Sequence, residues 1–208
     1  MNKKQIKHLK KDSVLKEVIL ASSKEIKPSL SLDIYHFLLD SIVSQQLSIK
    51  VADVIFNRVL DLFPERYPEA KHLLNVDDEV LRKAGLSYRK VAYLKNVASF
   101  SLENNLTFEY LQKMSDDEII DYLTQIKGVG KWTVQMILMF PMDRPDVFPV
   151  NDLGIQTNMR QLYSLKVDES KSKSLAKKEL LIQLENISEQ WRPYRTLASK
   201  YIWNFTKL

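Results

Sequence analysis

Apolar residues recur at three- and four-residue steps along most of the chain, which is the spacing of an amphipathic α-helix. The pattern is most complete over residues 34–63, and Pro64 and Pro68 then end this segment. Further helices are expected at about 76–84, 88–99 and 107–114. Since no alternating strand with a hairpin signal appears, the sequence predicts an all-α protein.

The helical pattern breaks and resumes at once in LTQIKGVGKWTVQMILMF, residues 123–140. Before it, Ser115 and Glu118 have the spacing of a capping box that starts a helix, and this helix stops at Gly128 and Gly130. Glycine permits positive φ angles and close backbone approach, so a second helix can begin at about Lys131 and return at a steep angle. The pattern predicts a helix-hairpin-helix.

Such a hairpin directs unpaired backbone N–H groups outward at the start of its second helix, where the helix dipole suits a phosphate. Gly130 keeps side-chain bulk away, Lys131 adds charge and Thr133 adds a hydroxyl. The motif can therefore hold a nucleic-acid backbone without reading sequence, through Gly128, Gly130, Lys131 and Thr133. A plain αα-corner, in which the glycines only form the turn, explains the hairpin equally well.

Composition excludes several kinds of site. The chain has no cysteine, so it has no disulfide, zinc-thiolate site or cysteine-ligated iron–sulfur cluster. Its three histidines are far apart in sequence and lack metal-ligand spacing. The net charge of +5 suits a polyanionic partner, and the basic run 191–208, which contains no acidic residue, is either a solvated face or a binding surface.

No apolar run reaches transmembrane length, and residues 1–13 lack the apolar core of a signal peptide. We therefore expect an intracellular protein, in the cytoplasm or nucleoid or in a eukaryotic nucleus, that has no membrane partner.

After the hairpin, the proline-punctuated loop PMDRPDVFPVNDLGIQ places Asp152 just before another helix. Together with IVSQQLSIKVA and WRPYRTLASKYIWNF, this order of motifs resembles the helix-hairpin-helix DNA glycosylase superfamily, and more narrowly its DNA-3-methyladenine glycosylase II branch. The resemblance spans about residues 34–205. It implies a two-lobed all-α fold with the active site in the cleft between the lobes and no iron–sulfur cluster. We expect a discontinuous lobe of residues 1–30 and 135–208, and a central lobe of residues 31–134 that ends in the hairpin.

The resemblance makes Asp152 the catalytic carboxylate. Hydrolysis of an N-glycosidic bond builds positive charge on the sugar, which a fixed carboxylate stabilises while it orients or deprotonates water. Asp152 could instead be only the N-cap of the helix that begins near Leu153, and both roles can coexist. Asp143 and Asp146 fit the family register poorly and are interpreted as loop residues.

Trp132 stands where strand-cleaving members of the superfamily carry a nucleophilic lysine. Because tryptophan cannot form a Schiff base, the resemblance implies a monofunctional glycosylase, with Lys131 and Lys127 as the alternative nucleophiles. Trp132 could also be a core residue of the hairpin.

The resemblance further assigns Trp132 and Trp203 to a lesion pocket, whose electron-rich rings favour positively charged alkylated bases. Met136 and Leu153 replace aromatic residues of relatives and are also assigned to this pocket, which leaves the lesion range open.

In SQQLS, Gln46 matches the side chain that the family inserts in place of the flipped base, with Leu47 as the alternative. Gln45 and Gln46 could equally be polar residues on a helix surface. The resemblance also implies a monovalent cation, Na⁺ or K⁺, on the backbone carbonyls near Thr124, Ile126 and Val129. No other cofactor is expected.

These features together predict a monomeric enzyme of base excision repair that binds damaged double-stranded DNA, flips out alkylated purines such as 3-methyladenine and 7-methylguanine, and hydrolyses them off. The alternatives are a glycosylase of the same fold for etheno or deaminated bases, a non-catalytic helix-hairpin-helix DNA-binding module, and a helical scaffold without salt-dependent DNA binding. An acid after the hairpin favours the enzyme, because a pure binding module does not need one.

Overall fold

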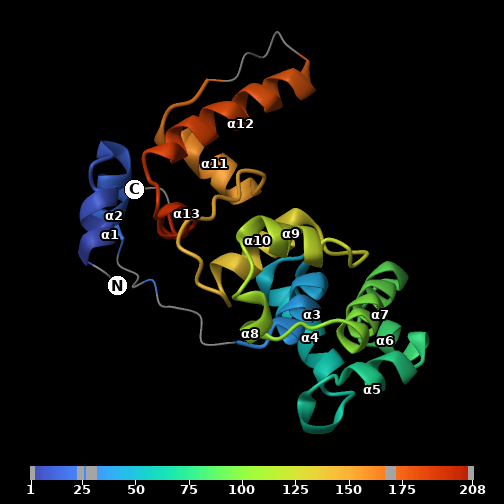
Figure 1. The fold of residues 1–208 in the computed structure, drawn as a ribbon. Helices are drawn as coiled ribbons and strands as arrows, with labels where there is room; N and C mark the ends of the chain where they lie inside the picture. Colours follow the sequence, from blue (N-terminus) through green and yellow to red (C-terminus); the bar gives the residue numbers. More distant parts are fainter. Residues whose placement is uncertain (1–2, 23–25, 27–31, 167–171, 206–208) are drawn as a thin grey trace. The chain divides into compact units, whose positions relative to one another are not determined.

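The computed structural model describes residues 3–22, 26, 32–166 and 172–205 of the 208-residue chain (Figure 1). Within these ranges the ordered elements are α-helices and one 3-10 helix, with no strand, which confirms the all-α prediction. None of the helices in them is long and apolar enough to cross a membrane.

The chain forms two compact units. Unit 1 combines Met1–Ser29 with Asp143–Leu208, and unit 2 is the intervening Leu30–Met142. The sequence placed the second boundary after residue 134, which lies inside helix α10 (Lys131–Met139). The structure keeps this helix whole because its apolar residues belong to the core of unit 2 as far as Met139.

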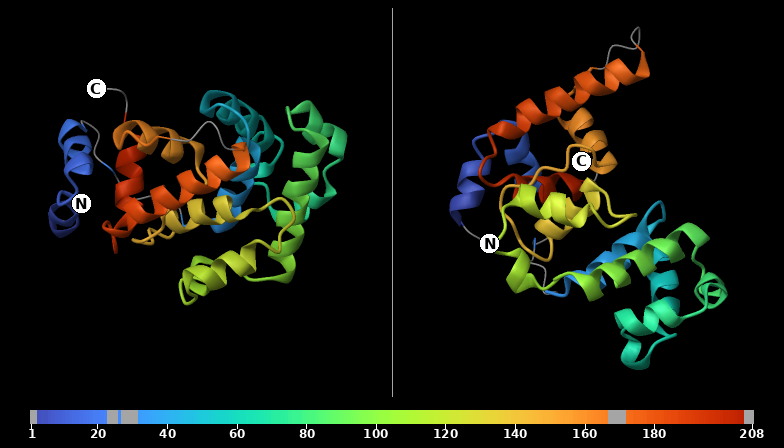
Figure 2. Two further views of the ribbon diagram at one scale, coloured as in Figure 1. Left: turned by 90° about the horizontal axis from the view of Figure 1, so that it is seen from above. Right: turned by 45° about the vertical axis from the view of Figure 1, so that its right-hand side comes forward.

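Unit 2 is built around α7, which packs against α3, α5 and α6, while α10 packs against α9 and α3 (Figures 1 and 2). Leu38, Val91 and Ile137, from three of these helices, are completely buried. In chain order, the elements of unit 2 are α3 (Ile34–Ser44), α4 (Ile49–Leu60), η1 (Pro64–Arg66), α5 (Ala70–Asn75), α6 (Asp78–Lys83), α7 (Tyr88–Glu103), α8 (Phe108–Leu111), α9 (Asp116–Leu123) and α10.

Several helix bounds differ from the expected ones. The apolar segment 34–63 is not one helix, because the chain leaves the helix at Gln45 and re-enters it at Ile49. In that break Gln46 has a φ of 60°, a left-handed conformation that is uncommon for residues other than glycine. Helix α5 was missed, α7 extends four residues beyond the expected end at 99, and α8 is a single turn.

Unit 1 joins the N-terminal helices α1 (Lys3–Leu9) and α2 (Ser13–Ala21) to three helices from the end of the chain. These are α11 (Leu153–Leu162), α12 (Lys173–Glu189) and α13 (Arg195–Trp203). Trp191 is fully buried in the core that they share, with Leu15 and Ile155 in the same cluster.

A buried carboxylate holds the two parts of unit 1 together. Asp12 Oδ1 caps α2 by accepting from the backbone N–H groups of Val14 and Leu15 at 2.9 and 3.1 Å. Its Oδ2 accepts from the Tyr163 hydroxyl at 2.6 Å and from Trp191 Nε1 at 2.8 Å. Burial raises the pKa of Tyr163, and the bond to Asp12 raises it further, so this hydroxyl stays a donor. The N-terminal segment is thereby tied to the C-terminal helices.

Candidate active site and DNA interface

The helix-hairpin-helix predicted from residues 115–140 is present in unit 2. Ser115 and Glu118 form the capping box of α9, in which the Ser115 N–H donates to Glu118 Oε2 at 2.7 Å and the Glu118 N–H to Ser115 Oγ at 3.3 Å. Helix α10 begins at Lys131, as expected, with Gly130 as its N-cap. The hairpin thus presents the start of α10 as a candidate phosphate site.

The two hairpin glycines have different roles. Gly128 has a φ of +109°, and a Cβ atom there would lie 2.3 Å from Cγ of Tyr93, so the turn admits only glycine at this position. Gly130 has a φ of −100°, so it does not use the positive φ angles that glycine permits. A Cβ on Gly130 would meet nothing within 4 Å. Gly128 therefore serves packing, and Gly130 leaves the start of α10 open.

The side chains of α10 divide between surface and core. Lys131 is exposed, and Trp132 is 40% exposed, which argues against Trp132 as a core residue of the hairpin. Met136, one turn later, is buried. Thr133 is also buried, at 2% exposure, so its hydroxyl does not belong to the surface that its sequence position suggested. Lys131 and Trp132 remain as the candidates for contact with DNA.

Asp152 lies at the N-terminus of α11, where the sequence expected a cap. Its Oδ1 accepts from the Ile155 N–H at 2.9 Å and from Trp203 Nε1 at 2.7 Å. One bond is local, while the other crosses to α13, which Asn158 Nδ2 holds by donating to the Ile202 carbonyl at 2.8 Å. The carboxylate is therefore both an N-cap and the partner of a predicted pocket tryptophan. Charge-assisted bonds of this kind fix its orientation.

Gly154 belongs to the same site, although the sequence analysis did not single it out. A Cβ atom there would lie 3.1 Å from Asp152 Oδ1 and 3.2 Å from Trp203 Cδ1, which is tighter than ordinary contact. The sequence signal that could have identified it is a glycine in the first turn of a helix. Glycine destabilises a helix there, so its presence indicates that another group needs the space. Leu153, beside Asp152, is 76% exposed.

The predicted wedge residues lie in unit 2, in the break between α3 and α4. Gln46 and Leu47 are both exposed there. The alternative in which Gln45 and Gln46 lie on a helix surface is wrong, because α3 ends at Ser44. Gln45 Nε2 donates to the Gly128 carbonyl at 3.1 Å, so this loop contacts the hairpin. Insertion of Gln46 into DNA stays a prediction.

The carbonyls expected to hold a monovalent cation lie in the hairpin turn. That of Ile126 accepts from the Val129 N–H at 2.9 Å, and Thr124 ends α9 as its C-cap. Within the described part of the chain, no group of three or more histidine, cysteine, aspartate or glutamate residues could hold a metal ion. The cation on Thr124, Ile126 and Val129 stays a prediction.

The basic residues near the C-terminus bind carboxylates of unit 1. Arg195 Nε donates to Asp146 Oδ1 at 2.8 Å, and Arg192 Nη1 donates to Asp146 Oδ2 at 2.6 Å. Lys200 is buried, with Nζ 3.4 Å from Asp143 Oδ1. These pairs favour a structural role over a DNA-binding surface for residues 191–205, while Lys207 lies outside the described residues. They agree with the interpretation of Asp143 and Asp146 as loop residues.

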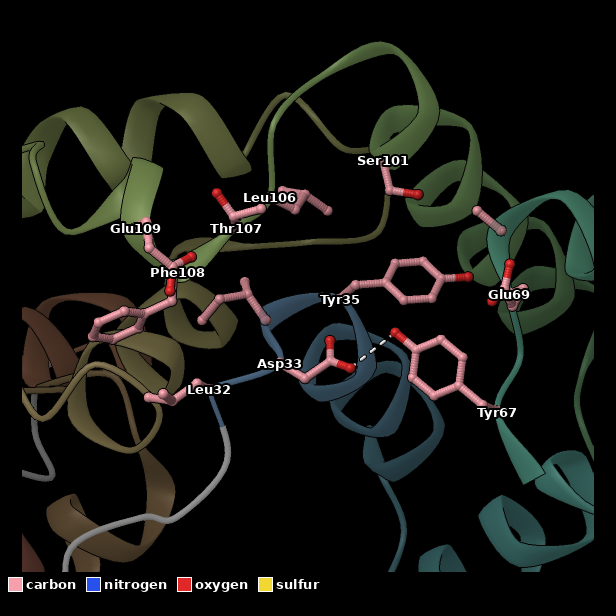
Figure 3. A pocket seen from close by; sticks show the side chains of 12 residues that line it. Leu32, Asp33, Tyr35, Tyr67, Glu69, Ser101, Leu106, Thr107, Phe108 and Glu109 are labelled. Atoms are coloured by element: carbon pink, nitrogen blue, oxygen red, sulfur yellow. Dashed lines mark hydrogen bonds between the residues drawn. The ribbon is translucent and has the colours of Figure 1, made fainter. Parts of the chain in front are cut away.

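A separate cavity of about 480 Å³ lies in unit 2, and none of the predicted site residues lines it (Figure 3). Three of its polar residues serve the fold: Asp33 caps α3 and accepts from the Tyr67 hydroxyl at 2.8 Å, while the Tyr35 hydroxyl donates to the Pro68 carbonyl at 2.7 Å. We therefore do not include it in the candidate site.

The predicted site is thus divided between the units. Asp152, Leu153 and Trp203 belong to unit 1, whereas the hairpin, Trp132 and the exposed loop with Gln46 belong to unit 2. That these two groups act in one cleft stays a prediction.

Comparisons with known proteins agree on one family. Residues 39–183 match the model of the HhH-GPD superfamily base excision DNA repair protein. The chain is 35% identical over 176 residues to DNA-3-methyladenine glycosylase 1 of Schizosaccharomyces pombe, covering 84% of this chain and 73% of that protein.

Two solved structures support the same assignment. The S. pombe 3-methyladenine DNA glycosylase Mag1 in complex with abasic DNA superimposes with a TM-score of 0.83 at 30% identity, covering 98% of this chain and all of that one. A DNA-3-methyladenine glycosidase from Bacillus halodurans gives 0.75 at 35% identity, with 96% and 87% covered. The chain therefore belongs to the HhH-GPD superfamily of base excision DNA repair proteins, in its DNA-3-methyladenine glycosylase branch.

Proposed function

We propose that this protein is a monofunctional DNA glycosylase that hydrolyses alkylated purines of the 3-methyladenine and 7-methylguanine type from damaged double-stranded DNA, inside the cell. The observation that carries the proposal is the Asp152 carboxylate, whose Oδ1 is fixed by the Ile155 N–H and by Trp203 Nε1. The substrate class rests on the relatives, which are named 3-methyladenine glycosylases.

Asp152 acts on the sugar of the flipped nucleotide. As the N-glycosidic bond breaks, positive charge develops on the deoxyribose, and a carboxylate that is already oriented stabilises this charge without reorganisation. The same carboxylate orients or deprotonates the water that attacks the anomeric carbon. The products are a free base and an abasic site in an intact strand.

Recognition of the base depends on its charge. Alkylated purines of this type are cationic, and a cation over an indole ring gains about 0.5–2 kcal/mol. Trp132 offers such a ring, since it is 40% exposed. Normal purines are neutral and lack this term, so a ring of this kind favours the damaged base.

The hairpin holds the DNA backbone. The start of α10 carries the positive end of a helix dipole, Gly130 places no side chain over it, and Lys131 is exposed beside it. Contacts of this kind position the protein without reading sequence, which suits an enzyme that must find damage anywhere in the genome.

Strand cleavage is not part of the proposal. An enzyme that cleaves the strand through a Schiff base needs an amine beside the sugar, and Trp132 occupies the register of that amine in the superfamily. Lys131 and Lys127 are the alternative nucleophiles. Trapping with borohydride distinguishes them, because it captures a Schiff base covalently.

The test compares the wild type with Asp152→Asn on methylated duplex DNA. Glu185→Gln is the matched control, because it removes one negative charge from an exposed position of unit 1. We expect wild type and control to release 3-methyladenine and 7-methylguanine, and Asp152→Asn to be slower by about a hundred- to thousandfold. Strand breaks should appear only after alkali. If Asp152→Asn keeps the wild-type rate, Asp152 is not the catalytic carboxylate.

A second lesion class follows from Met136. By the resemblance, this residue stands where a relative carries an aromatic ring, and it is itself buried, so stacking there is weaker and the range of bases is open. Duplexes with a single ethenoadenine or hypoxanthine test that range directly. Binding of DNA without release of any of these bases would favour a non-catalytic helix-hairpin-helix module.

A further inference from the structure

One lysine of α7 holds the loop that carries Gln46. Lys90 Nζ donates to the Val43 carbonyl at 2.7 Å and to the Gln45 carbonyl at 2.8 Å. Both carbonyls lie at the C-terminal end of α3, where helical carbonyls lack partners within the helix. Because Lys90 forms no ion pair with any residue that the structure describes, its half-buried charge serves these two backbone oxygens.

The next residues along α7 hold the hairpin. Tyr93 lies three residues after Lys90, and its ring fills the space in which Gly128 would carry a Cβ. Asn96, three residues further on, donates from Nδ2 to the Lys127 carbonyl at 3.0 Å. Residues at this spacing are neighbours on a helix surface. One side of α7 therefore contacts both the loop after α3 and the turn between α9 and α10.

The loop and the hairpin also contact each other directly, through Gln45 Nε2 and the Gly128 carbonyl at 3.1 Å. The result is a closed ring of three contacts: α7 to the loop, the loop to the hairpin, and the hairpin to α7. All of these lie within unit 2. Such a ring fixes the separation of the loop and the hairpin better than either contact alone.

The loop needs support from outside itself. Gln46 has a φ of 60° without being glycine, and Leu47 and Ile49 are 37% and 82% exposed, so burial of apolar side chains contributes little to its shape. A conformation of this kind persists only where its surroundings determine it. In the described structure, the ammonium group of Lys90 is the one long-range donor to the carbonyls of Val43 and Gln45, where α3 ends and the loop begins.

From these contacts we infer that Lys90 is a positioning residue for base flipping. Lys90 sets the loop of Gln46 at a fixed distance from the phosphate-binding hairpin. Insertion of Gln46 is thereby coupled to binding of the DNA backbone by the hairpin. The inference rests on the proposed function. If the loop is loosened, the excision rate should fall most for a lesion that still pairs with its opposite base. It should fall least for a lesion that leaves the duplex easily.

The experiment uses Lys90→Met, which keeps the apolar stem and removes the donors. Its matched control is Lys83→Met, an exposed lysine on α6 of the same unit. Single-turnover excision is measured on two duplexes, each with one 7-methylguanine, placed opposite cytosine or opposite a tetrahydrofuran abasic analogue. We expect Lys90→Met to slow excision opposite cytosine about tenfold and opposite the analogue less than about threefold, because the analogue removes the pairing that flipping must break. Lys83→Met should change neither rate.

A purely structural role of Lys90 would slow both duplexes equally, and this outcome, or no loss on either duplex, overturns the inference. Amide hydrogen exchange of the free protein gives a second measurement that needs no activity. Lys90→Met should speed exchange in peptides covering residues 42–48 and leave α13 unchanged. If the wild type releases no base, the proposed function is refuted independently of Lys90. If exchange in residues 42–48 is the same in Lys90→Met as in the wild type, the role of Lys90 is also refuted.

Discussion

Replacing Trp203 with phenylalanine removes one hydrogen bond from the proposed catalytic carboxylate and keeps an aromatic ring in its place. The lost bond is the 2.7 Å contact between Trp203 Nε1 and Asp152 Oδ1. Hydrogen bonds to charged groups contribute about 1.5–3 kcal/mol. Since about 1.4 kcal/mol corresponds to a tenfold rate change, excision should slow about 10- to 150-fold if this bond holds the carboxylate toward the sugar.

The assay is single-turnover release of 7-methylguanine, together with the dissociation constant for DNA that contains an abasic analogue. We expect the rate to fall while the dissociation constant changes little, because the bond orients a catalytic group and does not bind the DNA backbone. Circular dichroism of the variant should show the wild-type helix content, since the backbone bond from Ile155 to Asp152 Oδ1 still caps α11.

A double-mutant cycle decides whether the two residues act together. In a background of Asp152→Ala, the change Trp203→Phe should have little further effect on the rate, because its partner is already gone. If the two losses multiply, Trp203 acts independently of Asp152, for example by stacking on the base, and the reasoning from the hydrogen bond is refuted.

Three further predictions test the frame around the site. Gly128→Ala should lower the unfolding free energy in urea by more than about 2 kcal/mol, because φ is +109° there and the new Cβ would meet the Tyr93 ring. Gly130→Ala should keep the unfolding free energy and weaken DNA binding. Equal urea midpoints for the two variants would contradict the packing argument. Asp12→Ala should cost about 3 kcal/mol or more in unfolding free energy, because it leaves buried donors unsatisfied, and a loss below about 1 kcal/mol would show that water replaces the carboxylate. Burial raises the pKa of Tyr35 above the unfolded value of about 10, so its contribution to stability is present below pH 10 and falls by about 1.4 kcal/mol per pH unit above it. Tyr35→Phe should therefore make the unfolding free energy less dependent on pH above 10, and an unchanged slope would contradict this.

The hairpin was predictable because its signals are local. The capping box from Ser115 to Glu118 spans four residues, and the glycines after α9 mark the turn themselves. The N-cap role of Asp152 was predictable for the same reason. The bond from Trp203 to Asp152 was not, because it joins residues that are 51 positions apart and depends on how α13 packs on α11.

The break between α3 and α4 shows what local sequence cannot encode. Gln45 to Ser48 contains neither glycine nor proline, and apolar residues continue on both sides, so the pattern favours one helix. At this break the carbonyls of Val43 and Gln45 accept from Lys90 Nζ, which lies some 45 residues later in the chain. A helix can end without a breaker when tertiary contacts satisfy its last carbonyls.

The glycines link these observations to the site. The chain has only four, and Gly128, Gly130 and Gly154 all lie at the hairpin or beside Asp152. The absence of a side chain at Gly128 leaves room for the Tyr93 ring, and at Gly154 for the Trp203 ring. At Gly130 a Cβ atom would meet no protein atom within 4 Å. A residue without a side chain weakens a helix or turn unless something else uses the space. At two of the positions an aromatic ring uses it, and at the third the open N-terminus of α10 is left for a ligand, which is the position that a DNA phosphate would take.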